Sequence, residues 1–109
     1  MKTILDAIGN TPLLDIEGIW VKMEYLNPSG SIKARIAKYM IERAENEGLL
    51  KPGDTIVEAS SGNTGNAMSM VAAVKGYKMM VIMPTGLSQE RVAISKAFGA
   101  EVRTVGDFH

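Results

Sequence analysis

The chain of 109 residues has the length of one domain, and its 12 Lys and Arg residues balance its 12 Asp and Glu residues. A net charge of +0 disfavours nucleic acid and anionic membranes as partners, and 46% apolar residues are typical of a globular domain. The sequence has no cysteine and one histidine, His109, so it predicts no disulfide, no thiolate nucleophile and no metal site. The lack of cysteine, of a secretory signal and of a bilayer-length apolar run fits a cytoplasmic location.

The first part of the chain predicts a β-hairpin followed by a helix. Over residues 11–26, two apolar runs flank a turn near Gly18, and apolar and polar residues alternate after it. A cluster of turn-forming residues covers positions 27–31, where Ser31 is placed to cap a helix. We expect that helix over residues 32–47 because a glycine follows it directly.

The second part predicts three strands separated by single helices. Apolar strands are expected over residues 54–59, 78–83 and 101–105, and helices over residues 64–75 and 88–98. This alternation is typical of βαβ units and therefore indicates an α/β fold with a parallel sheet. The nearly continuous apolar character of the middle strand suits a sheet that is covered on both faces.

The alternation of strands and helices is still running where the sequence stops. In a typical α/β domain a further helix would follow the last predicted strand. We therefore expect the 109 residues to be part of a longer protein. The alternative is a minimal three-stranded domain, which would bury only a modest core.

Lys33 lies on the apolar side of its predicted helix. At about 100° per residue, Ala37, Met40 and Ala44 fall within about 40° of Lys33, in the middle of the apolar face. A lysine there, in the first turn, opposes the helix dipole and loses hydration, and both effects favour a neutral, nucleophilic amine. Such an amine suits imine chemistry with a carbonyl group. The angle alone favours the other interpretation, a lysine that extends into solvent at the end of the helix.

A run of small polar residues between the first predicted strand and its helix could bind an anion. Backbone N–H groups point out of the first turn of such a helix, and Gly62 and Gly65 allow a close approach. The run lacks both the phosphate-loop lysine and the dinucleotide glycine pattern, so it suits a carboxylate or a single phosphate. An ordinary capped turn is equally compatible with it. The candidate ligands are Ser60, Ser61, Gly62, Asn63 and Thr64.

Four motifs stand out along the chain: GNTPL at residues 9–13, NPSGSIK at residues 27–33, SSGNTG at residues 60–65 and GAEV at residues 99–102. Taken together, they resemble the N-terminal portion of the cysteine synthase and cystathionine β-synthase family of fold-type II pyridoxal-phosphate enzymes. The resemblance implies an α/β fold, a three-layer parallel-sheet βαβ domain with an N-terminal β-hairpin. It implies a single partial domain over residues 1–109.

The resemblance also implies roles for individual residues. Lys33 would carry pyridoxal 5'-phosphate as an imine and later move the substrate α-proton. Asn63 would contact the ring hydroxyl of the cofactor, and the loop would hold the carboxylate of an amino-acid substrate through Ser60, Ser61, Gly62, Asn63 and Thr64. The implied reaction is β-replacement, in which an O-activated serine loses its leaving group and sulfide adds to give cysteine. The full enzyme would be a homodimer, without nucleic acid or membrane as a partner.

Two features of the resemblance concern what this chain lacks. Ala34 stands where the family commonly has Asp, whereas Arg35 is retained. Residues 31–109 would form the small α/β domain, and the hairpin over residues 11–26 would belong to a larger domain that mostly lies downstream. We therefore expect Trp20 to be unusually exposed. The phosphate-binding glycines of the family also lie downstream of residue 109, so we expect the isolated chain to be inactive.

Two other functions remain open on the sequence alone. One is a non-catalytic α/β module that binds a small anion, or a protein partner through an open sheet edge. The other is half of a nucleotide-binding domain, which the missing glycine pattern disfavours.

Overall fold

The computed structural model describes residues 3–106 as two sheets and a set of helices. Three strands alternate with α-helices after the N-terminal hairpin, as the sequence predicts, and two short 3-10 turns that it does not predict flank the hairpin. In chain order the elements are η1 (Ile4–Ala7), β1 (Leu13–Ile16), β2 (Ile19–Lys22), η2 (Glu24–Leu26), α1 (Lys33–Asn46), β3 (Thr55–Ala59), α2 (Asn63–Lys75), β4 (Lys78–Pro84), α3 (Gln89–Ala97) and β5 (Glu101–Val105). The predicted α-helices and the predicted strands of the larger sheet agree with these bounds to within one residue, and the hairpin strands lie inside the predicted range 11–26.

The larger sheet is parallel and has the strand order β3-β4-β5. In its register Val57 lies opposite Met80, and Met80 lies opposite Glu101 on the other side. The carboxyl ends of the three strands therefore meet at one edge of the sheet. This arrangement confirms the predicted α/β fold with a parallel sheet and a separate hairpin.

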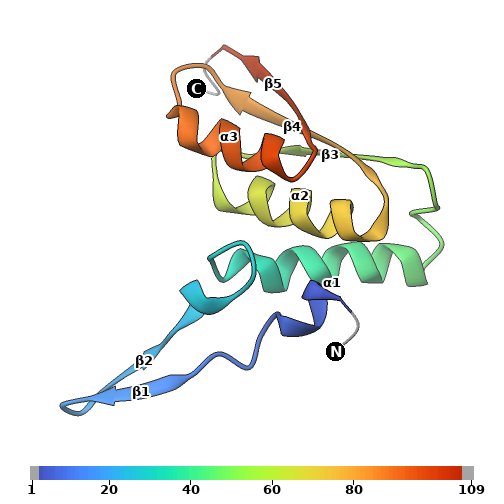
Figure 1. The fold of residues 1–109 in the computed structure, drawn as a ribbon. Coiled ribbons are helices and arrows are strands. Elements are labelled where there is room, and N and C mark those ends of the chain that lie inside the picture. The colour runs from blue at the N-terminus through green and yellow to red at the C-terminus, as the bar shows by residue number, and fades with distance from the viewer. Residues whose placement is uncertain (1–2, 107–109) are drawn as a thin grey trace.

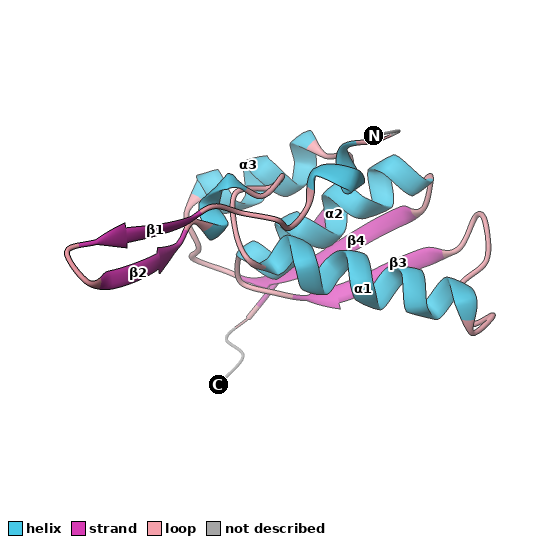
Figure 2. Ribbon diagram, turned by 90° about the horizontal axis from the view of Figure 1, so that it is seen from below, coloured by secondary structure: helices cyan, strands magenta, loops and turns pink. Residues whose placement is uncertain are grey.

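The helices form two layers on one face of the sheet (Figures 1 and 2). Helix α2 packs against β3 and β4, α3 packs against β5 and beside α2, and α1 lies on the far side of α2. This differs from the expected cover on both faces: among residues 3–106 the second face carries no helix, and Val57 is 54% exposed there. The physical reason is the sequential strand order, because two consecutive crossovers of the same hand place both connecting helices on the same side.

The core lies between the sheet and α1, with α2 in its centre. Met79, Val81 and Met83 alternate along β4 and point into this core, where they are buried. Helix α2 has no solvent-exposed side over its middle, since every residue from Gly65 to Ala72 is buried. A helix that packs against a sheet on one side and a helix on the other needs this composition.

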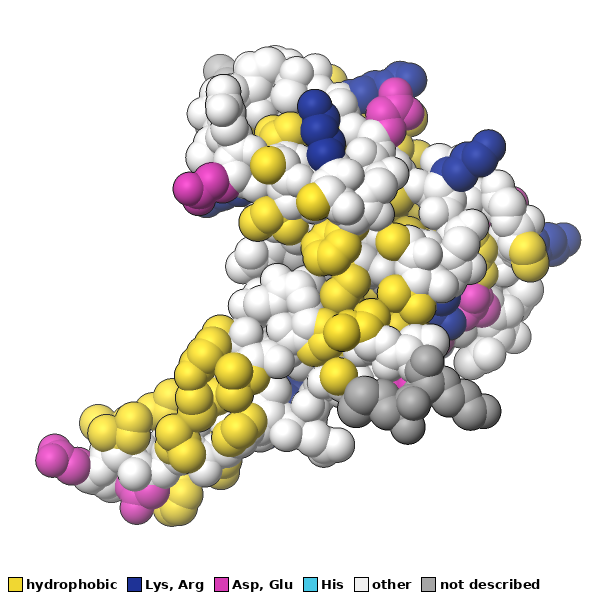
Figure 3. Space-filling model, viewed as in Figure 1, with side chains coloured by type: hydrophobic (Ala, Val, Ile, Leu, Met, Phe, Trp, Pro, Cys, Tyr) yellow, Lys and Arg dark blue, Asp and Glu magenta, His cyan; other side chains and the backbone are white. Residues whose placement is uncertain are grey.

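The hairpin extends away from the layered part of the molecule (Figure 1). Strands β1 and β2 pair antiparallel, and the two residues between them, Glu17 and Gly18, have φ values of 50° and 85°. Positive φ at both central positions is the requirement of a type I′ turn, and the Asp15 carboxylate accepts a hydrogen bond of 2.8 Å from the Gly18 N–H. Trp20 is 63% exposed, which confirms the expected exposure, and apolar side chains cover much of the hairpin surface (Figure 3).

Candidate functional site

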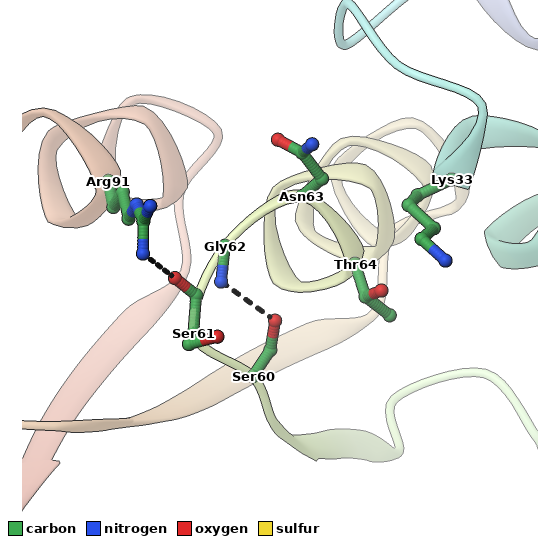
Figure 4. A pocket seen from close by; sticks show the side chains of 7 residues that line it. All are labelled: Lys33, Ser60, Ser61, Gly62, Asn63, Thr64 and Arg91. Atoms are coloured by element: carbon green, nitrogen blue, oxygen red, sulfur yellow. Dashed lines mark hydrogen bonds between the residues drawn. The ribbon is translucent and has the colours of Figure 1, made fainter.

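All of the sequence-predicted site residues line one cavity. Lys33 comes from the first turn of α1, and residues 60–64 form the loop that joins β3 to the start of α2. Together with Arg91 of α3 they line an open cavity of about 340 Å³ at the carboxyl edge of the parallel sheet (Figure 4). Ligands of parallel α/β sheets bind at this edge, so the cavity is the natural candidate site.

Lys33 lies at the border of the buried face of α1. The buried side chains of the helix are Ala34, Ala37 and Ile41, whereas Met40 is 44% exposed. The expectation that Lys33 occupies the middle of the apolar face is therefore wrong, because α2 covers α1 along a narrower stripe that is rotated away from Lys33. The consequence is a half-buried lysine whose side chain borders the cavity instead of the core. The N-cap of α1 is Ile32, one residue after the predicted cap Ser31, and it makes no side-chain cap hydrogen bond. The hydroxyl of Ser31 still accepts a 3.2 Å hydrogen bond from the Lys33 backbone N–H.

The loop is closed by the hydroxyl of Ser60. Its Oγ accepts hydrogen bonds from the backbone N–H of Gly62, at 3.2 Å, and of Gly65, at 2.9 Å. Gly65 permits this approach, since a Cβ there would lie 3.0 Å from Cγ1 of Val81 and 3.1 Å from Cβ of Ser60. Glycine at position 65 thus serves close packing of the loop against β4, and Ser60 shapes the loop as well as bordering the cavity.

The groups left free in the loop are mainly hydrogen-bond donors. Within residues 3–106 the backbone N–H groups of Asn63 and Thr64 have no acceptor, as expected for the first turn of a helix. The side chains of Ser61, Asn63 and Thr64 also make no hydrogen bond to another described residue. No Asp or Glu lines the cavity, whereas Lys33 and Arg91 both do. The donors and the two cations together suit an anionic ligand.

Arg91 is the cavity residue that the sequence reasoning missed. Its Nη1 donates a 2.9 Å hydrogen bond to the backbone carbonyl of Ser61, across from Lys33 (Figure 4). The signal that could have found it is its position in the first turn of the helix after β4. Because β3 and β4 are parallel neighbours, the segments that follow them start at the same edge of the sheet.

Two of the sequence motifs meet in a polar cluster beside the site. Glu24 pairs with Arg35 through two hydrogen bonds, of 2.6 Å and 3.0 Å, and also accepts from Thr11 and Asn27. Asn27 in turn accepts from the Gly9 N–H at 2.8 Å. The guanidinium of Arg35, followed by the hydroxyl of Thr11, lowers the pKa of Glu24 from 4.5 to about 2. This cluster joins the base of the hairpin to the helix turn that carries the cavity lysine.

Position 34, where the family resemblance leads one to expect Asp, is fully buried. The methyl group of Ala34 is 0% exposed and packs under the first turn of α1. A carboxylate at this point would lose its hydration, so alanine fits the packing of this chain. His109 lies outside the described residues, and none of the helices in residues 3–106 is long and apolar enough to span a membrane.

Curated relatives match this chain along most of its length. Cysteine synthase B of Salmonella typhimurium is 50% identical over 110 residues, which cover 94% of this chain and 36% of that protein. Cystathionine beta-synthase of Apis mellifera is 47% identical over 112 residues, which cover 94% of this chain and 22% of that protein. The chain therefore spans about a third or less of the length of these relatives.

A solved structure and a family model also match most of this chain. The crystal structure of O-ureido-L-serine synthase matches with a TM-score of 0.94 and 42% identity, over 97% of this chain and 36% of that one. The model of the family described as "Pyridoxal-phosphate dependent enzyme" matches residues 4–109. The cavity with its lysine and small polar loop thus lies in a chain that belongs to the family of pyridoxal-phosphate dependent enzymes.

Proposed function

We propose that this chain is the part of a cysteine synthase-like enzyme that supplies the cofactor lysine and the substrate-carboxylate loop. The reaction is β-replacement, in which sulfide displaces the activated oxygen of an O-activated serine to give cysteine. The observation that supports it best is the joint lining of one cavity by Lys33 and residues 60–64, from two motifs 27 or more positions apart. The identity to cysteine synthases supports the choice of reaction.

The residues in the cavity fit pyridoxal phosphate. When bound, this cofactor supplies an electron sink that stabilises negative charge at the substrate Cα. Lys33 would hold it through Nζ, since the lysine borders the cavity and no carboxylate lines it. Once released, the Nζ of Lys33 would take the proton from the substrate Cα. Asn63, with its amide free, would donate to the ring hydroxyl.

The loop would bind and orient the substrate carboxylate. The free N–H groups of Asn63 and Thr64 and the hydroxyls of Ser61 and Thr64 provide enough donors for both oxygens of a carboxylate. The hydroxyl of Ser60 can still donate its own hydrogen, although its oxygen already accepts two hydrogen bonds. Gly62 contributes backbone without a side chain, which leaves room for the carboxylate.

The proposal also divides the chain into parts of a larger enzyme. Residues 31–109 would be its small α/β domain, and residues 11–26 would pack in a larger domain supplied by the rest of a homodimeric protein. The grip on the cofactor phosphate would come from that larger portion. Because of this, the 109-residue chain alone should bind the cofactor weakly and should not catalyse the reaction.

The test is to trap the cofactor on the lysine that holds it. The chain is incubated with pyridoxal phosphate, reduced with borohydride and digested, and the modified peptides are identified by mass spectrometry. We expect Lys33 to carry most of the label, because it is the lysine beside the anion-binding loop. In a longer protein that contains this chain, Lys33→Ala should abolish β-replacement with sulfide.

The matched control is Lys38→Ala, which removes a half-buried lysine from the same helix outside the cavity. This variant should label as the unchanged chain does, and in the longer protein it should keep the activity. A label spread evenly over the lysines, an unchanged total label after Lys33→Ala, or unchanged activity of the longer protein after Lys33→Ala contradicts the proposal. An evenly spread label would favour an anion-binding module without catalysis, whereas unchanged activity would mean that Lys33 is not the catalytic lysine.

A further inference from the structure

We propose that Arg91 is a positioning residue that fixes the backbone of the 60–64 loop in its anion-binding form. The inference rests on the proposed carboxylate-binding role of that loop. Its starting point is the peptide group between Ser61 and Gly62. The carbonyl oxygen of this peptide accepts from Nη1 of Arg91 at 2.9 Å, and its N–H donates to Oγ of Ser60 at 3.2 Å (Figure 4).

A peptide group held at both ends cannot rotate without breaking both hydrogen bonds. Ser60 holds the N–H end from within the loop, and Arg91 holds the carbonyl end from another element of the fold. The N–H groups of Asn63 and Thr64 follow this peptide directly along the chain, so freedom of the backbone here would also loosen the segment that carries them. These are the free backbone donors at the start of α2, so their preorganisation depends on this peptide.

The contact also removes a repulsive group from the site. A peptide carbonyl carries partial negative charge, and an unpaired one beside the cavity would repel a carboxylate. Bound to a guanidinium, the Ser61 carbonyl is neutralised by a charge-assisted hydrogen bond. Arg91 itself pairs with no carboxylate among the described residues, so its charge is not compensated elsewhere.

The backbone from which Arg91 extends is itself anchored to α2. Ser95 follows Arg91 by four residues and so lies on the same side of α3. Its hydroxyl, fully buried, donates a 2.7 Å hydrogen bond to Oδ1 of Asn66, which is also buried. Helix α3 therefore contacts the chain on both sides of the point where the loop joins α2. Arg91 binds Ser61 in the loop, and Ser95 binds Asn66 in the helix. This gives the guanidinium a fixed base.

The test compares Arg91→Ala with Lys96→Ala in the 109-residue chain by ¹⁵N NMR. Lys96 is the matched control because it lies on the same helix, is exposed and carries the same charge, but does not line the cavity. Without any ligand, Arg91→Ala should speed hydrogen exchange of the Gly62 amide about tenfold relative to Lys96→Ala. A loss of charge alone would not speed exchange at the Gly62 amide in particular, so this measurement tests whether Arg91 positions the loop.

The second measurement is a titration with acetate at constant ionic strength, followed at the Asn63 and Thr64 amides. Arg91→Ala should raise the dissociation constant for acetate about tenfold, Arg91→Lys should recover part of the affinity, and Lys96→Ala should stay within about twofold of the unchanged chain. Unchanged exchange of Gly62 or unchanged acetate affinity in Arg91→Ala would overturn the proposal. The labelling of Lys33 by the cofactor is measured separately, so a failure of the proposed function can be distinguished from a failure of the proposed role of Arg91.

Discussion

Ser29 combines two unfavourable features in the turn that leads to the lysine. Its φ of 77° lies in the left-handed region, which costs a residue with a Cβ about 1–2 kcal/mol. Its Oγ is buried and has no hydrogen-bond partner among residues 3–106. The next residue, Gly30, also has a positive φ, of 87°, so the chain turns sharply just before α1 begins. At the scale of one residue, Ser29 therefore lowers the stability of the fold, while the sharp turn it forms leads the backbone into α1.

Ser29→Gly should raise the free energy of unfolding by about 1 kcal/mol. Glycine adopts the left-handed region without strain and removes the buried hydroxyl, and these gains exceed the added freedom of the unfolded chain. Urea denaturation of the chain measures the change. Ser31→Gly is the matched control in the same turn, and it should lower the stability by about 0.5 kcal/mol because the Lys33 N–H loses the Ser31 hydroxyl as its acceptor. An equal loss in both variants would contradict this account of Ser29.

At the scale of elements, a cluster of charges and one phenol joins α1 to the end of α2. Nζ of Lys75 lies 2.8 Å from Oε1 of Glu45 and 3.4 Å from Oε2 of Glu42. Tyr77, just before β4, donates its hydroxyl to the other carboxylate oxygen of Glu45. The pKa of Glu45 is lowered by these contacts, first by that with Lys75 and then by that with Tyr77. The cluster connects residues 30 or more positions apart at the end of the helices opposite the cavity lysine.

Tyr77 should therefore ionise late in an alkaline titration. Its hydrogen bond to Glu45 raises the pKa of Tyr77 from 10.0 to about 12, since the carboxylate disfavours a second negative charge. A raised folded-state pKa means that the contribution to stability is complete below pH 10 and is lost as the pH rises from 10 to 12. Tyrosinate absorbance should show a step near pH 12 that Tyr77→Phe removes and Tyr39→Phe retains. A Tyr77 step near pH 10 would contradict the contact.

The elements could be predicted from the sequence because their signals are local. The turn at Gly18, the glycine after α1 and the apolar run of β4 each mark a boundary within a few residues. The meeting of Lys33 with the 60–64 loop could be anticipated only through the family resemblance. Arg91 and the pairing of Glu24 with Arg35 could not be predicted, because each depends on how separate elements approach in space. The sequence pattern of α1 misplaced Lys33 for the same reason, since its partner helix decides which stripe is buried.

At the scale of the whole molecule, two apolar surfaces lie bare in residues 3–106. One is the free face of the parallel sheet, where Val57 is exposed but Lys78, Glu101 and Arg103 stand on the same face. The other is one face of the hairpin. In the register of β1 and β2, four exposed apolar side chains share that face without a charge among them, namely Leu14, Ile16, Ile19 and Val21. The hairpin face is therefore the one of the two surfaces that favours association with another molecule more strongly.

We expect the 109-residue chain to self-associate through this hairpin face. Covering about 300 Å² of apolar surface on each copy yields about 15 kcal/mol at about 25 cal/mol per Å², before the cost of about 4–15 kcal/mol for joining two molecules. A net gain of several kcal/mol corresponds to association at millimolar to micromolar concentration. Ile19 is 69% exposed, and Ile19→Thr should raise the dissociation constant at least about tenfold, because each copy in a dimer loses the same contact. Sedimentation velocity over a series of concentrations measures it.

Leu13→Thr is the matched control for this face. Leu13 is 54% exposed on the same hairpin but shares the opposite face with Asp15 and Lys22, so its replacement should change the dissociation constant by less than about threefold. Equal effects of Ile19→Thr and Leu13→Thr on the dissociation constant would show that the contact between copies does not lie on the apolar face. A compact monomer that stays stable at high concentration would contradict the expectation altogether. It would mean that covering the apolar hairpin face gains less free energy than two molecules lose in translational and rotational freedom when they associate.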